Sequence, residues 1–392
     1  MSMIDPTSSE QVIVQNELAA IFISLELSRS SWVVTSLSPG AGERLSRVQL
    51  AAGDLRALKA RFSLLQAKCR ARLNRDHQLN RDYQLVVIQE AGLDAFSLHR
   101  VLQMEGIESH VVDPASIATS RRRRRAKTDS IDGEALLRAL LAYKRGEPRV
   151  CAMVTPPSPE EEDRRQVCRE RRLLVTERVA HANRIKGLLF AQGVTDYEPV
   201  RRDRRERLET LNTADGRPLL PCLKQRICRE LDRLEMVIDQ IKAVEAQRDA
   251  LVAPQDDPQA IPALLQQLRG IGPEFAAVLW SEGLYRKFDN RRQLASYAGL
   301  APTPWQSGTV SREQGISKAG NARVRTTMIQ LSWLWLRHQP TSALTHWFHE
   351  RTKIANGRSK RVVIVALARK LLVSLWKFAT TGLVPEGAVL HC

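Results

Sequence analysis

The sequence of 392 residues has few cysteines, few aromatic residues and no long apolar run. Its six cysteines are scattered without a CxxC spacing, which argues against a disulfide framework and against a zinc ribbon. No segment approaches the roughly 20 apolar residues that a membrane-spanning helix needs. The N-terminus also lacks the basic and apolar regions of a secretory signal peptide. We therefore expect an intracellular, cytoplasmic protein with no membrane partner.

Acidic residues are in short supply relative to basic ones. The sequence holds 60 Lys and Arg against 43 Asp and Glu, which gives a formal net charge of +17. A surplus of this size favours a polyanionic partner, because each phosphate that a cation neutralises releases counterions. With 43% hydrophobic residues, a chain of this length can bury a core and divide into two or three domains.

Residues 1–155 alternate between strand and helix patterns. The patterns place strands at 21–28, 31–38, 44–51, 83–92 and 108–116, and helices at 54–73, 93–106 and 129–146. Three strands in a meander, with later strands entered through crossover helices, form the topology of the ribonuclease-H-like fold. We therefore predict an α/β domain of this type over 1–155.

Two proline-rich segments divide the rest of the chain, PPSP at 156–159 and VAPQDDPQAIP at 252–262. Between them, apolar residues spaced by threes and fours form one seam: Ile227, Leu231, Leu234, Ile238 and Ile241. The seam suits a helical hairpin or a coiled-coil contact, and we favour self-association over an internal bundle helix. The sequence thus predicts a helical or coiled-coil segment over 156–253 and a mainly helical domain over 254–392.

Four acidic residues stand where the predicted fold would bring them together. Glu26 lies in the first strand and Glu90 ends the fourth. Ligands gather at strand ends in an open sheet that contains parallel strands. Asp129 and Asp132, three residues apart, share one face of the helix that they begin. Four carboxylates in one place repel each other unless divalent cations lie between them, and oxygen ligands favour Mg²⁺ or Mn²⁺ over zinc.

Each acid taken singly has an ordinary explanation. Asp129 and Asp132 are typical of a helix start, and a glutamate at a strand end is commonly solvated. The set of four in topological order is the stronger signal. Two divalent ions held by such a set can activate an attacking oxygen and stabilise a leaving one in phosphodiester chemistry.

A run of cations precedes these aspartates. It consists of Arg121, Arg122, Arg123, Arg124, Arg125 and Lys127. Runs of like charge are commonly solvated or disordered, but this one lies inside a domain, between a predicted strand and a predicted helix. Its internal position favours contact with a nucleic-acid backbone, which the cations would hold beside Asp129 and Asp132.

Two features of 254–392 indicate further phosphate contacts. LRGIGPEFAAVL at 268–279 has the form of a helix-hairpin-helix turn, in which Gly270 and Gly272 let backbone amides approach a phosphate oxygen. A tight turn between helices without a ligand is the alternative. A loop rich in glycine and proline follows, and its cations are Arg312, Lys318, Arg323 and Arg325.

The same basic loop contains Ser307, followed by Gly308. A serine hydroxyl close to several cations can attack a phosphodiester, because the cations stabilise the charge on the alkoxide and on the phosphorane. Ser296, Ser311 and Ser317 lie nearby, and spacing alone does not choose among them.

Several of these segments together resemble one known family. The most specific are EAGLDAFSLHRVL, VVDPASIATSRRRRRAKTDSIDGEALLRALLAY, NRIKGLL, LRGIGPEFAAVL, LASYAGLAPTPWQSG and GISKAGNARVR. They are similar to the DEDD transposases of bridge-RNA-guided insertion sequences, relatives of the Piv-type DNA invertases. The likeness covers nearly the whole chain.

The resemblance implies a RuvC-like domain, a coiled-coil segment and a transposase domain with a nucleophilic serine. The second, third and fourth acids of the family's tetrad fall on Glu90, Asp129 and Asp132, and the serine of its SG pair falls on Ser307. Such a tetrad holds Mg²⁺, and the serine joins covalently to DNA. The family's first acid is an aspartate, whereas Glu26 stands at that position, so its carboxylate reaches roughly 1.5 Å further.

We therefore predict a transposase that cleaves and exchanges DNA strands, guided by an RNA that pairs with donor and target DNA. It would act as a homo-oligomer. One alternative is a metal-dependent nuclease or junction resolvase in which Ser307 is structural. Another is a nucleic-acid-binding relative with weakened catalysis.

Overall fold

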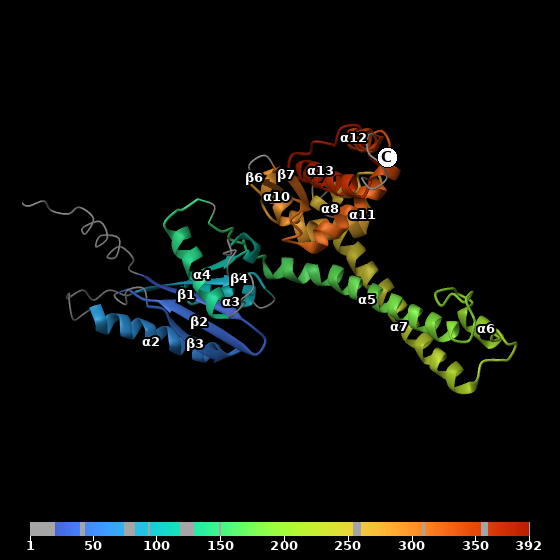
Figure 1. Cartoon of the computed structure of the whole chain (residues 1–392), viewed down its shortest axis with the longest axis horizontal. Helices are drawn as coiled ribbons and strands as arrows, with labels where there is room; N and C mark the ends of the chain where they lie inside the picture. The colour runs from blue at the N-terminus through green and yellow to red at the C-terminus, as the bar shows by residue number, and fades with distance from the viewer. Residues whose placement is uncertain are drawn as a thin grey trace, which may run out of the picture. The chain divides into compact units, whose positions relative to one another are not determined.

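The computed structural model describes residues 20–39, 44–73, 83–92, 95–117, 129–148, 150–253, 260–307, 310–353 and 360–391. The side chains at 73, 95, 115, 129–131 and 304–314 are not part of this description. The chain forms two compact units, Met1–Pro157 and Ser158–Cys392. Figure 1 shows the elements of both, and each unit is treated by itself below.

The first unit is built on one five-stranded sheet. Its strands are β1 (Ala20–Leu27), β2 (Ser31–Leu37), β3 (Ser46–Ala51), β4 (Gln84–Glu90) and β5 (Glu108–Val112). Their order across the sheet is β3-β2-β1-β4-β5. The first three pair antiparallel, whereas β4 and β5 continue the sheet parallel to β1. The predicted meander followed by crossover strands is therefore confirmed.

Helices cover both faces of this sheet (Figure 1). On one face, α2 (Leu55–Leu73) and α3 (Ala95–Met104) pack on Ile21, Ile23 and Leu25 of β1. On the other face, α4 (Asp129–Lys144) packs on Phe22. Because both faces are buried, β1 is apolar along most of its length, as central strands of such sheets are. A short 3-10 turn, η1 (Pro114–Ser116), follows β5.

The second unit begins with a helical hairpin. Its arms are α5 (Pro159–Phe190) and α7 (Pro221–Val252), and Ser158 caps α5 through a capping box with Glu161. The predicted seam of α7 is buried against α5: Ile227, Leu231 and Leu234 pack near Ile185 and Leu189, and Ile241 packs near Val167 and Leu174. The expectation that this seam serves self-association is wrong, because a helix of the same chain covers it.

The hairpin tip has a small core of its own. It contains α6 (Arg204–Glu209), and Tyr197, Leu208 and Leu219 from the tip pack with Leu189 at the end of α5. Tyr197 donates its hydroxyl hydrogen to the carbonyl of Arg204 at 2.6 Å. The tip is therefore folded around local contacts.

The remainder of the second unit is a helical bundle. Its elements are α8 (Ile261–Gln266), α9 (Pro273–Leu279), the π-helical turn η3 (Trp280–Leu284), α10 (Arg291–Tyr297), α11 (Ala322–His338), α12 (Ala343–Lys353) and α13 (Lys360–Thr381). Leu331 and Trp335 of α11 and Leu371 and Leu375 of α13 lie in its core. This confirms a mainly helical C-terminal region. No helix in the described part of the chain combines the length and apolar character that crossing a membrane requires.

A two-stranded sheet interrupts the bundle where the sequence predicted a loop. Strands β6 (Pro302–Ser307) and β7 (Val310–Ile316) pair antiparallel, with an irregularity between Pro302 and Pro304. Prolines argued for a loop, but a two-stranded ribbon has two open edges on which a proline removes no ladder bond. The expectation of an irregular loop over this stretch was wrong.

Candidate active site and nucleic-acid interface

Two acidic residues of the first unit lie at the carboxyl edge of its parallel strands. β1 and β4 run parallel, with Leu25 paired to Gln89, and Glu26 and Glu90 follow them. Val112, the partner of Glu90 across β4 and β5, packs in the cluster under α4. Since paired residues point to the same side of a sheet, Glu90 lies on the α4 face.

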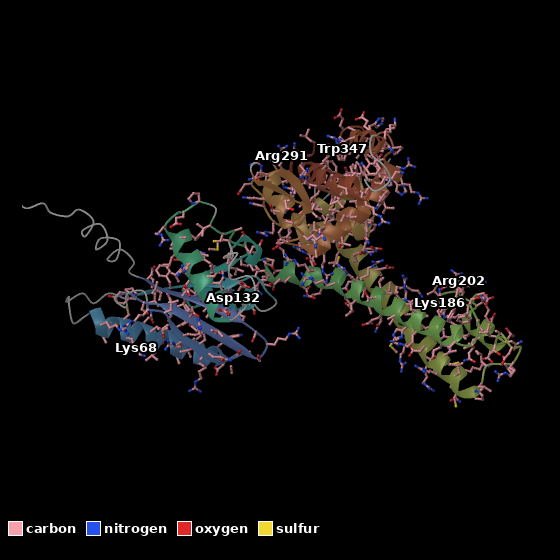
Figure 2. All side chains as sticks on the ribbon, in the orientation of Figure 1. Lys68, Asp132, Lys186, Arg202, Arg291 and Trp347 are labelled. Atoms are coloured by element: carbon pink, nitrogen blue, oxygen red, sulfur yellow. The ribbon has the colours of Figure 1, made fainter. Side chains whose placement is uncertain are left out.

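Glu26 lies on the same face and reaches α4 itself. A Cβ atom at Gly133 would lie 2.5 Å from Glu26 Oε1 and 2.6 Å from Thr35 Oγ1, so the side chains leave room only for a glycine. Two residues before Glu26, Ser24 Oγ donates a hydrogen bond to the Gly133 carbonyl at 2.8 Å. These contacts bring the Glu26 carboxylate to the helix residue that follows Asp132, which Figure 2 labels on α4.

The remaining aspartate is on the same helix. Asp129 is the first residue of α4 and precedes Asp132 by three positions, a spacing that puts two residues on one helical face. The Asp129 side chain is outside the described part of the structure. The structure therefore brings Glu26, Glu90 and the α4 turn that carries Asp132 to one face of the sheet.

Thr35 belongs to this group, although sequence reasoning did not select it. Its side chain is fully buried, and Oγ1 has no hydrogen-bond partner among the described residues. A buried hydroxyl without a partner costs about 1–3 kcal/mol, so such a group often marks a site for water or an ion. Thr35 pairs with Ser24 across β1 and β2. A polar residue inside the apolar strand SWVVTSL was the available signal.

The atoms on this face suit a hard divalent cation. The carboxylates of Glu26 and Glu90, with the Thr35 hydroxyl beside that of Glu26, offer the oxygen donors that Mg²⁺ and Mn²⁺ prefer. Among the side chains that the structure describes, no three Asp, Glu, His or Cys gather closely enough to form a metal site by themselves. The residues present thus fit a divalent ion in the kind of atom that they offer.

The arginine run lies outside the described residues. It comprises Arg121, Arg122, Arg123, Arg124, Arg125 and Lys127, and in the sequence it ends just before α4 begins. Its contact with a nucleic-acid backbone stays a prediction.

Ser307 is the last residue of β6 and pairs with Val310 of β7. Its hydroxyl is not part of the described structure. Ser311 and Arg312 lie on the opposite strand of the hairpin, with Arg312 paired to Trp305. The fold therefore puts Ser307 next to the hairpin turn, in a different unit from the acidic residues.

The start of α11 carries cations that the sequence analysis predicted to contact phosphate. The Asn321 side chain caps the helix and accepts hydrogen bonds from the backbone amides of Arg323 and Val324. Lys318 adopts a positive φ of 57°, rare for a residue other than glycine. Arg325 Nη1 donates to the Lys318 carbonyl at 2.9 Å. The segment before α11 is thus held by specific hydrogen bonds, with cations at a helix N-terminus, where an anion is favoured.

A buried ion-pair network lies beside that helix start. The Glu282 side chain is only 3% exposed, and it accepts hydrogen bonds from Arg169 Nε at 3.0 Å and Asn321 Nδ2 at 3.2 Å. Arg323 Nε lies 3.6 Å from the same carboxylate. Burial raises the pKa of Glu282, but the hydrogen bond and charge of Arg169 outweigh burial, so the pKa is lowered. Arg323 is therefore partly engaged by a carboxylate of its own chain.

The turn with Gly270 and Gly272 packs against α11. Gly270 has a φ of +93°, and a Cβ there would lie 2.7 Å from the Cβ of His338. Gly272 begins α9 with extended backbone and has open space around its Cα. The turn and its packing explain Gly270 without a ligand, and a phosphate contact at this turn stays a prediction.

Comparisons with known proteins assign the chain to a family. Residues 263–346 match a family described as Transposase IS116/IS110/IS902, and residues 48–191 match the DEDD transposases of the IS110 type. The protein y4rJ of Sinorhizobium fredii, named as a candidate transposase, is 64% identical over 386 residues, which cover 96% of each chain. The chain belongs to the IS110 family of DEDD transposases.

More distant relatives of this transposase carry similar names. The transposase for insertion sequence element IS1111A of Coxiella burnetii is 27% identical over 300 residues, or 75% of this transposase and 77% of the relative. The transposase for insertion sequence element IS1328 of Yersinia enterocolitica is 26% identical over 265 residues, or 66% and 73%. The protein is therefore an enzyme that acts on DNA, and membership in the DEDD family implies a divalent metal ion.

Proposed function

We propose that this transposase is an RNA-guided DNA recombinase with a RuvC-like first domain. In it, Glu26, Glu90, Asp129 and Asp132 hold Mg²⁺, and Ser307 is the nucleophile. The observation that carries the proposal is the meeting of Glu26 and Glu90 on the α4 face of the sheet, where Glu26 reaches the helix turn of Asp132. Strands β1 and β4 and helix α4 are far apart in the sequence, so their acids meet only through the fold.

The acidic residues orient a phosphodiester rather than react with it. A bound divalent ion would supply charge stabilisation for the attacking and leaving oxygens. The backbones of Glu26 and Glu90 belong to strands whose central residues are buried, and a firmly held backbone favours the fixed placement of charge that electrostatic catalysis needs. The Thr35 hydroxyl, buried next to Glu26, can donate a hydrogen bond to that carboxylate or to a water beside it.

The serine makes strand exchange possible without an external energy source. Ser307 Oγ attacks a DNA phosphorus and gives up its proton to solvent, while the bond from phosphorus to one deoxyribose oxygen breaks and that oxygen takes a proton from solvent to leave as a hydroxyl. The product is a phosphodiester between Ser307 and one DNA end. A deoxyribose hydroxyl of the second DNA then attacks the same phosphorus and releases Ser307 with its hydroxyl restored. Each step therefore forms one phosphodiester bond as it breaks another.

Guidance by RNA rests on the family resemblance and on charge. The chain carries a net charge of +17, enough to hold more than one polyanion at once. Base pairing between guide and DNA would select the sites, while the protein contacts the backbones. This arrangement would explain cations in several segments of the sequence, including the run before α4 and the start of α11.

Trapping the covalent product tests the proposal. The transposase is incubated with guide RNA, donor and target DNA and Mg²⁺, and then denatured. We expect a DNA strand attached to the protein in the wild type and in Ser311→Ala, the matched control on the neighbouring strand. The attachment should disappear in Ser307→Ala and fall by at least about 100-fold in Glu90→Gln, because groups that act as one unit fail together.

Two other outcomes would contradict the proposal. Cleaved DNA ends without any protein attachment, unchanged in Ser307→Ala, would indicate a nuclease that uses water. Binding of DNA and RNA without cleavage, in the wild type and in Glu26→Asp alike, would indicate a binding protein. Recombination in Glu26→Asp alone would show that the extra methylene at this position has weakened the enzyme.

A further inference from the structure

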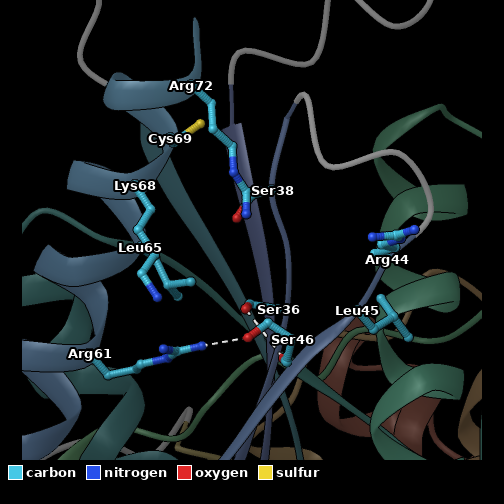
Figure 3. A pocket seen from close by; sticks show the side chains of 10 residues that line it. All are labelled: Ser36, Ser38, Arg44, Leu45, Ser46, Arg61, Leu65, Lys68, Cys69 and Arg72. Atoms are coloured by element: carbon cyan, nitrogen blue, oxygen red, sulfur yellow. Dashed lines mark hydrogen bonds between the residues drawn. The ribbon is translucent and has the colours of Figure 1, made fainter.

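Apart from the basic segments described above, the first unit has a basic pocket between α2 and the strands β2 and β3 (Figure 3). It is a cavity of about 350 Å³, which we call the α2 pocket. Its lining consists of Ser36, Ser38, Arg44, Leu45, Ser46, Arg61, Leu65, Lys68, Cys69 and Arg72. Four cations and three hydroxyl groups line the pocket, and no acid is among the described residues of its lining.

The periodicity of α2 explains why the cations gather. Phe62, Leu65 and Cys69 are buried against the sheet. Arg61 and Lys68 are seven residues apart, about two helical turns, so they share one flank of α2. Arg72 follows Lys68 by one turn on the same flank. Figure 3 shows Arg61 and Arg72 pointing across to the serines of the strands.

The cations of the α2 pocket have no acidic partner among the residues that the structure describes. Elsewhere in the chain, arginines with a structural role pair with carboxylates, as Arg205 does with Glu235 and Arg248 with Glu274. Arg61 Nη2 donates to Ser46 Oγ at 2.7 Å, whereas Arg61 Nε is buried with no hydrogen-bond partner in the described structure. Arg44, Lys68 and Arg72 are exposed, whereas Arg61 is half-buried. A buried donor without a partner is unfavourable, and Arg61 Nε lies in a pocket lined by three further cations, which points to an anion as the missing partner.

A phosphate group matches this lining. It offers several acceptor oxygens to guanidinium and ammonium groups, and serine hydroxyls can donate to the same oxygens. The substrate of a transposase is DNA, so phosphodiesters are the anions that the enzyme meets. We propose that the α2 pocket binds a backbone phosphate of a nucleic acid.

The phosphate in the α2 pocket is not the one that is cleaved. Ser36 follows Trp32 and Val34 at even spacing, and these pack under α2, so Ser36 lies on the sheet face opposite α4. Ser36 also pairs with Ile23, three residues before Glu26, or roughly 10 Å along the strand. The pocket therefore anchors a different part of the nucleic acid from the part at the acidic residues.

Binding measurements with the full chain test this site. The variant Arg61→Gln/Lys68→Gln/Arg72→Gln is compared with the wild type for affinity to a labelled DNA duplex and to a labelled RNA over a range of salt concentrations. We expect the slope of log K against log salt to become shallower by about one for each phosphate that the variant no longer neutralises. Affinity at low salt should fall roughly tenfold or more for the nucleic acid that occupies the pocket.

Two variants separate this effect from a general decrease in charge or a disturbed fold. Lys59→Gln removes a cation from the same helix, but Lys59 pairs with Glu105 and does not line the pocket. This variant should change the slope of log K against log salt by less than about one half. Arg61→Lys/Arg72→Lys keeps the charge and should keep most of the slope. Thermal unfolding of each variant verifies that the sheet is intact.

The results decide the source of the phosphate. A shallower slope with DNA only, or with RNA only, identifies the nucleic acid that the pocket binds. An unchanged slope with both would overturn the proposal, as would thermal stabilisation by inorganic phosphate or pyrophosphate that the triple variant lacks while nucleic-acid binding stays the same. Binding is measured without cleavage, so a failure of Ser307 to form a DNA adduct leaves this result unaffected.

Discussion

At the scale of single residues, Gly133 and Glu26 form a matched pair. A Cβ at Gly133 would collide with Glu26 Oε1 and with Thr35 Oγ1. In the proposed tetrad, Glu26 stands where the resemblance implies an aspartate, so its side chain is one methylene longer, and the absence of a side chain at Gly133 gives it space. The longer acid is therefore accommodated by the facing helix.

This pairing predicts the effect of Gly133→Ala. The added methyl group should displace the Glu26 carboxylate and lower DNA-adduct formation by about 10- to 100-fold, the usual cost of disturbing a group that orients a metal ligand. Combining it with Glu26→Asp should recover part of the activity, because the shorter acid withdraws from the methyl group. Adduct yield at several Mn²⁺ concentrations measures both.

The control is Gly187→Ala in α5, where the added methyl group meets open space. Wild-type activity in Gly133→Ala, at the same Mn²⁺ requirement, would show that Glu26 does not act from the position seen here.

Candidate site residues could be selected from the sequence, but the side chains that contact them in the fold could not be predicted. The four acids were proposed from their order along the predicted strands and helix, and their joint role stays a prediction. Glu282 could not be selected, and the only signal for Thr35 was its polar character inside an apolar strand, since the importance of both comes from burial beside groups roughly 100 residues away, such as Gly133 for Thr35 and Arg169 for Glu282. The serines of the basic stretch could be ranked only by family resemblance.

At the scale of elements, the start of α11 depends on Glu282. The carboxylate joins α5, through Arg169, to the residue that caps α11, Asn321. A buried charge of this kind stabilises the fold only while its partners are present. The network therefore ties the hairpin to the bundle within the second unit.

We predict that Glu282→Gln destabilises the second unit by about 1–3 kcal/mol at neutral pH. The folded pKa of Glu282 lies below its unfolded value, which is about 4.3. Its contribution is therefore present above that pH and is lost as pH falls through the folded pKa. The difference between wild type and variant should shrink in acid.

Urea unfolding followed by tryptophan fluorescence measures this difference, because six of the seven tryptophans lie between residues 280 and 376. Glu170→Gln, an exposed position on α5, is the control and should change stability by less than about 0.5 kcal/mol. If the difference in free energy of unfolding between Glu282→Gln and wild type stayed constant down to acidic pH, the stabilising role of the ionised Glu282 would be contradicted.

Most helices and strands could be predicted, because the spacing of the apolar residues and the length of each segment indicate the same type of element. The strands of the first unit and its helices follow their patterns closely, and the sheet order follows from the connections. The ribbon of β6 and β7 could not be predicted, since prolines and glycines dominate its sequence. The use of the α7 seam also escaped prediction, because an apolar stripe looks the same whether its partner is α5 or a second chain.

At the scale of the whole molecule, the acids and the serine belong to separate compact units. If the active enzyme is a homo-oligomer, one copy can supply the acids and another the serine. The division of the chain proposed from the sequence, at about residues 155 and 253, puts the hairpin between these two functions.

Mixing two inactive variants tests shared sites. We expect Glu90→Gln and Ser307→Ala to form no DNA adduct separately, and to regain adduct at up to about a quarter of the wild-type level when mixed in equal amounts before assembly, since mixed oligomers then contain some complete sites. The adduct should carry the Glu90→Gln chain, which retains Ser307. No recovery at any mixing ratio would mean that each site is built within one chain.

The two 32-residue helices of the hairpin have a consequence for engineering. Each is roughly 48 Å long at 1.5 Å per residue, and the tip at the far end folds around its own small core. Removing or inserting seven residues in both helices would shift that tip by about 10 Å while nearly preserving its rotation. Adduct formation by such variants would show whether activity depends on the position of the tip along the hairpin axis.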